Sequence, residues 1–91
     1  SFSLSQNYPN PFNASTTIEY GLPKNSELSI SIYDIRGRFV KDIYTGEKQA
    51  GYHVTQWNGS NDVGRNVASG LYFIVLHTPE YRVARKALIL K

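Results

Sequence analysis

Apolar and polar side chains alternate strictly over residues 28–34, and this pattern constrains the fold more than any other in the sequence. Leu28, Ile30 and Ile32 fall on one face of an extended strand, whereas serine and tyrosine side chains occupy the other face. No segment of about ten residues or more repeats its apolar side chains at the helical period. Turn-forming residues recur at intervals of about 8–12 residues, which is typical of a β-sandwich or barrel. The sequence therefore predicts an all-β fold, with six or seven antiparallel strands in two packed sheets.

Further stretches along the chain have the composition of strands. We expect strands at residues 15–22, 28–34, 39–44, 52–57, 71–77 and 81–90, with residues 2–4 adding an edge strand and residues 45–51 forming a polar loop. Val40 and Ile43 are out of phase with each other, which predicts a β-bulge in their strand. Residues 71–76 are apolar on both phases, as expected for a central strand.

The connection after the alternating strand has the composition of a tight hairpin. Asp34 is suited to accept backbone N–H groups, and Gly37 can adopt the positive φ that such a turn needs. We therefore interpret both residues as hairpin formers rather than as residues that contact a partner.

The only tryptophan, Trp57, precedes a segment crowded with Asn, Gly, Ser and Asp. Tyr52 and Val54 share one face of the strand that leads to Trp57, whose side chain falls on the other face, so either a bulge precedes Trp57 or both faces are partly covered. Residues 58–62 have the oxygen-rich composition of a calcium loop but lack its alternating acids and terminal Glu, which favours a turn capped by its own side chains. We interpret Trp57 as a packing anchor.

Two prolines stiffen the N-terminal segment, because Pro9 and Pro11 fix their own φ and favour extended conformations in the residues before them. Tyr8 and Phe12 bracket this segment, and we expect both rings to cap one end of the core. A proline-rich ligand for an aromatic groove is the alternative interpretation.

The net charge of +3 is unevenly distributed along the chain. Residues 81–91 contain Arg82, Arg85, Lys86 and Lys91 but no acid, so this segment carries +4 and the rest of the chain sums to −1. A nucleic-acid-binding surface would spread its cations over a face with stacking aromatic rings between them. A solvated strand face explains a single basic strand better, and we expect no nucleic-acid partner.

Candidate chemical sites are sparse in this sequence. His53 and His77 stand in separate predicted strands without the spacing of metal ligands, and the chain has no cysteine. Ser69 lies in a turn without the strand-to-helix elbow of a serine nucleophile, and the acids form no recognisable catalytic pair. We therefore expect no enzyme activity, no cofactor and no metal site. Exposed tyrosines could stack on sugars, which leaves a carbohydrate-binding role open.

The length of 91 residues corresponds to a single domain, which can bury a core without disulfides. The sequence contains no signal peptide and no apolar run of about 20 residues, so stable membrane insertion is not expected. Because the chain contains no Met, Ser1 is not the product of a start codon. We expect residues 1–91 to be one C-terminal domain of a longer secreted protein.

Short motifs occur in order along nearly the whole chain. They are Asn7–Asn13 (Asn-Tyr-Pro-Asn-Pro-Phe-Asn), Ser15–Ile18, Leu22-Pro23, Ile32–Arg38, Ala50–Tyr52, Trp57–Gly59, Gly64, Ala68–Tyr72 and Lys86–Lys91. Together they resemble the C-terminal sorting domain of type IX (Por) secretion cargo proteins, and Trp57–Tyr72 is also similar to the immunoglobulin-like module of flagellar hook-capping proteins. The basic terminal strand favours the sorting domain, whereas Ala14 departs from the family, which often has proline there. The resemblance implies an immunoglobulin-like antiparallel β-sandwich of about seven strands.

The resemblance also implies where recognition occurs. The sorting features would be the strand start Gly70, Leu71 and Tyr72 and the terminal segment Arg85, Lys86, Ala87, Leu88, Ile89, Leu90 and Lys91. It implies a non-catalytic targeting domain that directs an upstream cargo domain via the periplasm across the outer membrane, to be secreted or held at the cell surface. The partner would be a secretion translocon or a sorting protease. The alternatives are a structural immunoglobulin-like spacer and a carbohydrate-binding accessory module of a secreted hydrolase.

Overall fold

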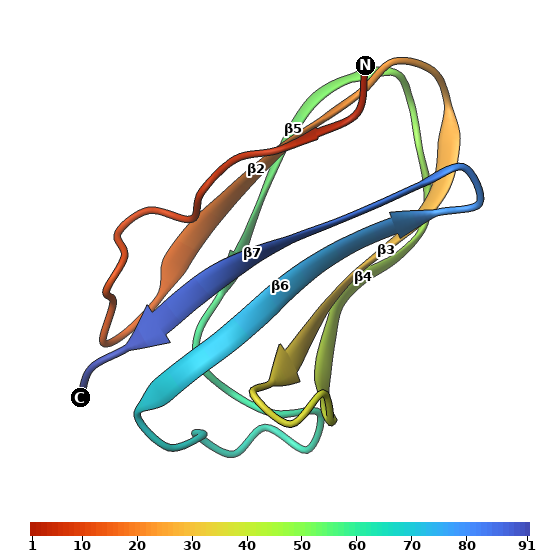
Figure 1. Cartoon of the computed structure of the whole chain (residues 1–91). Coiled ribbons are helices and arrows are strands. Elements are labelled where there is room, and N and C mark those ends of the chain that lie inside the picture. The colour runs from red at the N-terminus through yellow and green to blue at the C-terminus, as the bar shows by residue number, and fades with distance from the viewer.

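The computed structural model describes residues 1–91, which form seven strands and no helix (Figure 1). The strands are β1 (Ser3–Leu4), β2 (Thr16–Leu22), β3 (Ser26–Asp34), β4 (Phe39–Lys48), β5 (Gly51–Trp57), β6 (Gly70–Thr78) and β7 (Tyr81–Ile89). They pair antiparallel in a three-stranded sheet of order β1-β2-β5 and a four-stranded sheet of order β4-β3-β6-β7. The fold is an immunoglobulin-like antiparallel β-sandwich, which confirms the predicted fold class and the additional edge strand near the N-terminus.

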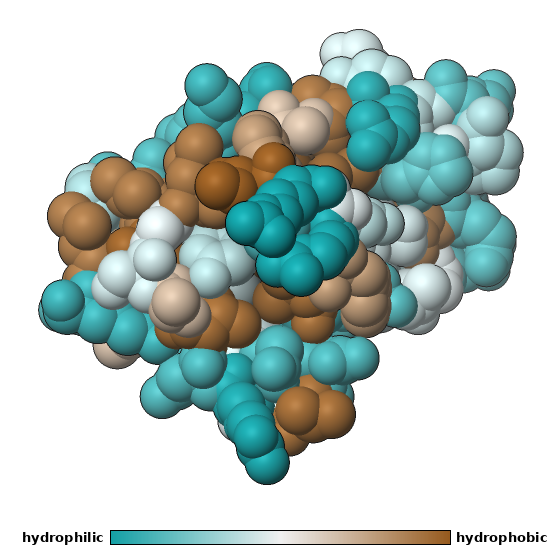
Figure 2. Space-filling model, turned by 60° about the horizontal axis from the view of Figure 1, so that its bottom comes forward, coloured by the Kyte–Doolittle hydropathy of each residue, from teal (hydrophilic) through white to brown (hydrophobic).

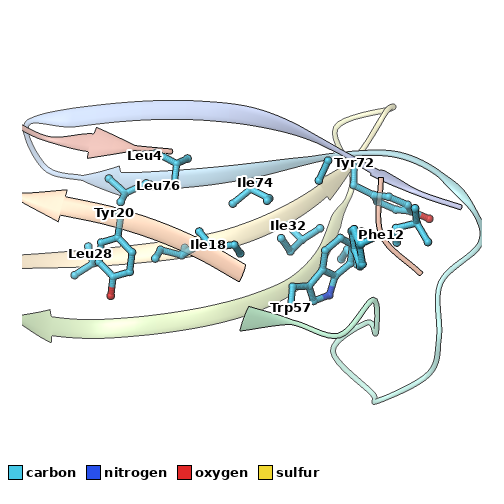
Figure 3. Packing of buried hydrophobic residues seen from close by; sticks show 14 of the residues in the cluster. Leu4, Phe12, Ile18, Tyr20, Leu28, Ile32, Trp57, Tyr72, Ile74 and Leu76 are labelled. Atoms are coloured by element: carbon cyan, nitrogen blue, oxygen red, sulfur yellow. The ribbon is translucent and has the colours of Figure 1, made fainter. Parts of the chain in front are cut away.

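The core lies between the two sheets, where alternate side chains of the strands point inward (Figure 3). Ile30 and Ile32 of β3 are fully buried, as their alternation with serine predicts. Ile18 of β2 is fully buried as well and faces Ile32 from the three-stranded sheet. Each such side chain contributes about 1.5–3 kcal/mol of transfer free energy, so the period-2 pattern directly stabilises the contact between the sheets.

β6 is a central strand that pairs with β3 on one side and with β7 on the other, as predicted. Ile74 and Leu76 point into the core and are fully buried, whereas Phe73 and Val75 stand on the outer face of the four-stranded sheet. Neighbouring side chains cover this outer face in part, since Phe73 is half-buried and Val75 is buried. The partial cover of the outer face explains why both the inward and the outward positions of β6 are apolar.

β3 and β4 form a hairpin with two register shifts, which confirms the predicted irregularity. Because of these shifts Val40 is buried and Ile43 also packs against the core, although their spacing does not fit a regular strand. The prediction of a polar loop at residues 45–51 is wrong, because β4 continues to Lys48, which pairs with Ser26 of β3. These residues are polar because β4 is an edge strand, and polar side chains on an edge discourage pairing with other chains.

β5 pairs with β2 without a register shift, so no bulge precedes Trp57. Trp57 points into the core, whereas Tyr52 and Val54 lie on the outer face and are 91% and 64% exposed. Both explanations predicted for this strand are wrong, because the sandwich covers only its inner face. Tyr52 lies opposite Gly21, and its ring takes the space that a side chain there would need, since a Cβ atom on Gly21 would lie 3.0 Å from Tyr52 Cε1.

The N-terminal segment crosses from one sheet to the other. β1 pairs with β2 in the three-stranded sheet, and Phe12 forms a parallel bridge with Ile89 at the edge of the four-stranded sheet. Phe12 is buried, as predicted. The prediction that Tyr8 caps the core is wrong, because its ring is 77% exposed. Tyr8 pairs with Thr17, whose side chain lies on the outer face of β2 next to the inward-pointing Ile18, and residues directly opposite each other share a face.

Candidate recognition surface

The two predicted recognition segments lie side by side at one end of the sandwich. Residues 70–72 begin β6 and residues 87–89 end β7, and the register joins Gly70 to Ile89, Leu71 to Leu88 and Tyr72 to Ala87. Figure 1 shows the end of β7 beside the start of β6. Two segments that are separate in sequence therefore form one continuous surface, which we call the recognition surface and define as residues 70–72 and 85–91.

Only part of the recognition surface is accessible from outside. The exposed or half-buried members are Gly70, Leu71, Arg85, Lys86, Leu88, Leu90 and Lys91. The buried members are Tyr72, Ala87 and Ile89. In the folded domain the first group can touch a partner, while the second group holds the two strands on the core.

The N-terminal segment seals the outer edge of β7 next to this surface. The Nε2 atom of Gln6 donates to the carbonyl of Lys86 at 2.6 Å, and the Oδ1 atom of Asn10 accepts the backbone N–H of Leu88 at 2.9 Å. Phe12 completes the seal, because its N–H donates to the carbonyl of Leu88 and its carbonyl accepts the N–H of Leu90, each at 3.0 Å. The backbone of residues 86–90, at the end of β7, therefore has no free edge.

Two shallow clefts open beside the recognition surface. The first, of about 420 Å³, is lined by residues 11–15, by Leu90 and by Pro9, and both Pro9 and Pro11 follow cis peptide bonds. The second, of about 310 Å³, lies between residues 69–72 and the β3–β4 hairpin. Figure 2 views this end of the molecule and shows hydrophobic side chains interleaved with hydrophilic ones. Each cleft has one wall that belongs to the recognition surface.

The last residue is tied to the segment that precedes β6. The backbone N–H of Lys91 donates to Ser69 Oγ at 3.0 Å, and its Nζ atom donates to the carbonyl of Val67 at 2.6 Å. The hydroxyl of Tyr72 donates to the carbonyl of Ala68 at 2.8 Å in the same segment. These bonds fix the C-terminal residue against the start of β6.

The β3–β4 hairpin is built on Asp34, as predicted. Its Oδ1 atom accepts the backbone N–H groups of Arg36 and Arg38, each at 2.9 Å, and Gly37 has a φ of 80°. The backbone N–H of Arg38 is the main reason why the pKa of Asp34 lies below its ordinary value. Burial raises the pKa of Tyr72, and the negative charge of Asp34 raises it further. The hairpin is therefore held by a carboxylate that favours its ionised form.

Trp57 anchors the core directly behind the recognition surface (Figure 3). It is fully buried, and the rings of Phe12 and Tyr72 meet it edge-on at centroid distances of 5.6 and 5.5 Å. Its Nε1 atom donates to the carbonyl of Ser60 at 2.9 Å. The ring is buried among aromatic side chains, as the prediction of a packing anchor requires, and it connects the residue that seals β7 with a residue that begins β6.

Residues 58–62 form the predicted self-capped turn. The Oδ1 atom of Asn58 accepts the backbone N–H and the hydroxyl of Ser60, at 3.2 and 2.6 Å. The Oδ1 atom of Asn61 accepts the N–H groups of Val63 and Arg65, at 3.1 and 3.0 Å. These side-chain oxygens therefore bind the backbone of the turn itself.

The remaining candidate groups lie apart from one another. His53 is on β5, where it stacks on Tyr20 and its Nε2 atom lies 2.7 Å from the carbonyl of Gln49, whereas His77 is on β6 in the other sheet. No three His, Asp or Glu side chains gather closely enough to hold a metal ion. The molecule has no helix whose length and apolarity would allow it to cross a membrane.

Sequence reasoning missed the side chains that seal β7, Gln6 and Asn10. Their signal is the position of Asn10 between two prolines, which lack the backbone N–H needed to pair with a strand. An amide side chain carries both N–H donors and a carbonyl acceptor, so it can bind a strand where the backbone of this segment does not: Gln6 donates to β7 and Asn10 accepts from it. Reasoning also missed the apolar outer face around Phe73, although the second apolar phase of residues 71–76 indicates it.

A family model described as the FlgD Ig-like domain matches residues 10–79 of the chain. The matched region contains β2 to β6 and leaves β1 and β7 outside it. No curated protein sequence matches the chain. The match thus covers the sandwich up to the end of β6 but not the basic terminal strand.

Two solved structures have the same fold over nearly the whole chain. The structure of dimeric latent PorU from Porphyromonas gingivalis has a TM-score of 0.73 and 19% sequence identity, and the match covers 99% of this chain but 9% of the PorU chain. The structure of FlgD from P. aeruginosa has a TM-score of 0.69 and 19% identity, with 96% of this chain and 70% of that chain covered. The PorU match places this fold in a small part of a much longer chain.

Proposed function

Because the chain belongs to the FlgD Ig-like domain family, we propose that it is a non-catalytic module, and more specifically the C-terminal sorting domain of a type IX secretion cargo protein. The domain directs an upstream cargo domain via the periplasm across the outer membrane, to the cell surface or the medium. Its partner is a secretion translocon or a sorting protease. Neither nucleic acid nor stable membrane insertion has a part in this role.

The observation that carries this proposal is the pairing of the two recognition segments. Leu71 lies directly opposite Leu88, so their side chains share one face and a receptor can contact both at once. Leu90 is 55% exposed, and neither Lys86 nor Lys91 belongs to an ion pair. An exposed apolar side chain beside unpaired cations supports recognition by a protein receptor.

The test is export of a reporter fused before Ser1, in a bacterium with a working type IX system. Deleting residues 86–91 would remove Ala87 and Ile89 from the core, so loss of export would not separate unfolding from loss of the signal. The better variant is Leu90→Ser with Lys91→Glu, which changes two exposed side chains and removes one hydrogen bond, from Lys91 Nζ to the carbonyl of Val67. We expect less reporter outside the cell and a melting temperature close to that of the wild type.

The matched control is Val63→Ser with Arg65→Glu, which changes an exposed apolar residue and an exposed cation in the turn before β6. This control should be exported like the wild type. If the Leu90 and Lys91 variant is folded and is also exported like the wild type, the terminal segment is not the signal and the proposal fails.

The family match also favours a second candidate, a structural spacer or assembly module. A folded domain of unrelated sequence appended after Lys91 separates the two roles. A sorting signal read at the C-terminal segment should lose export, whereas a spacer should tolerate the extension.

The tyrosines do not favour the carbohydrate-binding alternative. Tyr8 and Tyr52 are the most exposed rings, and they lie opposite Thr17 and Gly21, four positions apart on β2. That separation is roughly 13 Å along the strand. Two rings so far apart do not form one stacking platform for a sugar chain.

A further inference from the structure

The outer face of the four-stranded sheet is more apolar than the solvated face of an antiparallel sheet usually is. Tyr33 lies opposite Phe73, and Val75 lies opposite Ala84, so these side chains stand together on the outer face of β3, β6 and β7. With Arg82 and the glycine of the hairpin they line a cleft of about 370 Å³. The cleft has an apolar floor and is open to solvent.

Two cations flank this cleft along β7. Arg82 and Lys86 are exposed, and each lies two residues from Ala84, so all three side chains point to the same face of the strand. The ion pairs of the molecule are Lys24–Glu80 and Arg38–Asp34, so Arg82 and Lys86 have no acidic partner. No acidic side chain lines the cleft. The acid Asp42 stands on the same face but on β4, two strands from Val75, where its Oδ1 atom accepts the hydroxyl of Ser31 at 2.6 Å. The β7 side of the cleft thus combines an apolar centre with a cation at each end, about 13 Å apart.

We propose that this face binds an extended acidic segment of a partner protein. One apolar or aromatic side chain of the segment lies over Phe73 and Val75, and carboxylates two residues before and two residues after it meet Arg82 and Lys86. Alternate side chains of an extended chain point the same way at the spacing of residues 82, 84 and 86. On a helix, acids four residues apart would be only about 6 Å apart and could not reach both cations. The recognised pattern is acid-x-apolar-x-acid.

The edge of β7 is a poorer site for such a segment than the face. Gln6, Asn10 and Phe12 already bind the edge from Lys86 onward. Before that point Arg85 Nη1 donates to the carbonyl of Ala84 at 3.2 Å and places a charge beside the edge. A charged side chain in this position discourages the addition of a strand. The partner therefore contacts side chains on the face rather than the backbone of β7.

The test uses the 91-residue chain and a fluorescently labelled peptide, Gly-Glu-Ser-Phe-Ser-Glu-Gly, in anisotropy titrations up to millimolar concentration. We expect saturable binding that weakens as salt is added, because exposed charges are screened. A peptide with Lys in place of both Glu residues and a peptide with Ser in place of Phe should each bind at least about tenfold more weakly. No saturable binding of the Glu-Phe-Glu peptide, or equal binding of the three peptides, would overturn the proposal.

Arg82→Glu is the decisive variant, because Arg82 is exposed and lies outside the recognition surface. It should weaken binding of the Glu-Phe-Glu peptide by about five- to tenfold, with an unchanged melting temperature. Arg65→Glu makes the same charge change in an exposed turn and should bind like the wild type. Equal binding by the wild type and Arg82→Glu refutes the site. So does binding to phosphatidylglycerol vesicles without binding to the peptide. Lys86 belongs to both surfaces, but Arg82 lies outside residues 70–72 and 85–91, so the effect of Arg82→Glu on peptide binding is independent of reporter export.

Discussion

Replacing Trp57 with alanine should remove a large part of the stability of the domain. The side chain is fully buried, packs against the rings of Phe12 and Tyr72, and donates a hydrogen bond to the carbonyl of Ser60. Truncating such a residue costs about 3–5 kcal/mol. At about 0.05–0.15 kcal/mol per residue, a domain of this length has about 5–14 kcal/mol in total. If the free energy of unfolding of the wild type lies at the lower end of this range, the variant keeps only a small part of it.

A second substitution separates the ring from its hydrogen bond. Trp57→Phe keeps aromatic contacts with Phe12 and Tyr72 but leaves the buried carbonyl of Ser60 without its donor, at a cost of about 1–3 kcal/mol. The difference between the two variants reports the packing of the phenyl ring, whereas the cost of Trp57→Phe combines the lost hydrogen bond with the smaller size of that ring.

The measurement is urea unfolding followed by far-UV circular dichroism, since the variants lack the tryptophan whose fluorescence would otherwise report unfolding. Val63→Ala is the control, because Val63 is 72% exposed and its truncation should change the free energy of unfolding by less than about 0.5 kcal/mol. A loss below about 1 kcal/mol for Trp57→Ala would show that the ring is not the anchor described here.

Three other substitutions test separate parts of the structure. The pKa of Asp34 is lowered in the folded protein, so its contribution to stability is complete above its unfolded-state pKa, near pH 4, and is lost as the pH falls through the folded-state value. Urea midpoints of wild type and Asp34→Asn should therefore differ at neutral pH and converge in strong acid, and a constant difference would contradict this assignment. Gly59→Ala should cost about 1–2 kcal/mol in calorimetry, because Gly59 has a φ of 74° that other residues adopt only with strain, and an unchanged melting temperature would speak against this. Asn10→Ala should speed hydrogen exchange of the Leu88 amide, whose acceptor is lost, and unchanged exchange would mean that the seal is not closed in solution.

Local sequence patterns predict those strands in which apolar and polar side chains alternate regularly between the inner and the outer face. The alternation of Leu28, Ile30 and Ile32 is sufficient, because one face of that strand meets the core and the other does not. Asp34 and Gly37 predicted their hairpin for a similar reason, since the turn is closed by bonds between neighbours in sequence. Interactions within about five residues can be read from composition.

Features that depend on a distant partner could not be predicted in this way. The side on which Tyr8 points is set by its pairing with Thr17, and nothing in residues 7–13 specifies that register. The sequence predicts a loop at the end of β4, because the polar residues of an edge strand have the composition of a turn. In both cases the local composition was compatible with more than one arrangement.

One of the two features of the recognition surface, the pairing of its two segments, can be predicted from the sequence. The turn at Pro79-Glu80 pairs Thr78 with Tyr81, and regular pairing from there brings Tyr72 opposite Ala87, so the juxtaposition of the two segments follows from the length of one turn. The seal by the N-terminal segment does not follow, because it joins residues at opposite ends of the sequence.

The seal on β7 also determines when this domain can finish folding during synthesis. Asn10 and Leu88 are 78 positions apart. The hydrogen bond from the Leu88 N–H to Asn10 Oδ1 can therefore form only after nearly the whole domain has left the ribosome. Contacts of such long sequence separation form slowly. A chain that stops before Leu88 keeps an open strand edge and an incompletely covered tryptophan, which are features of aggregation-prone intermediates. A domain in which the seal on β7 has formed must contain every residue up to Leu90. A receptor that binds only this sealed form would therefore not bind chains whose synthesis ended earlier.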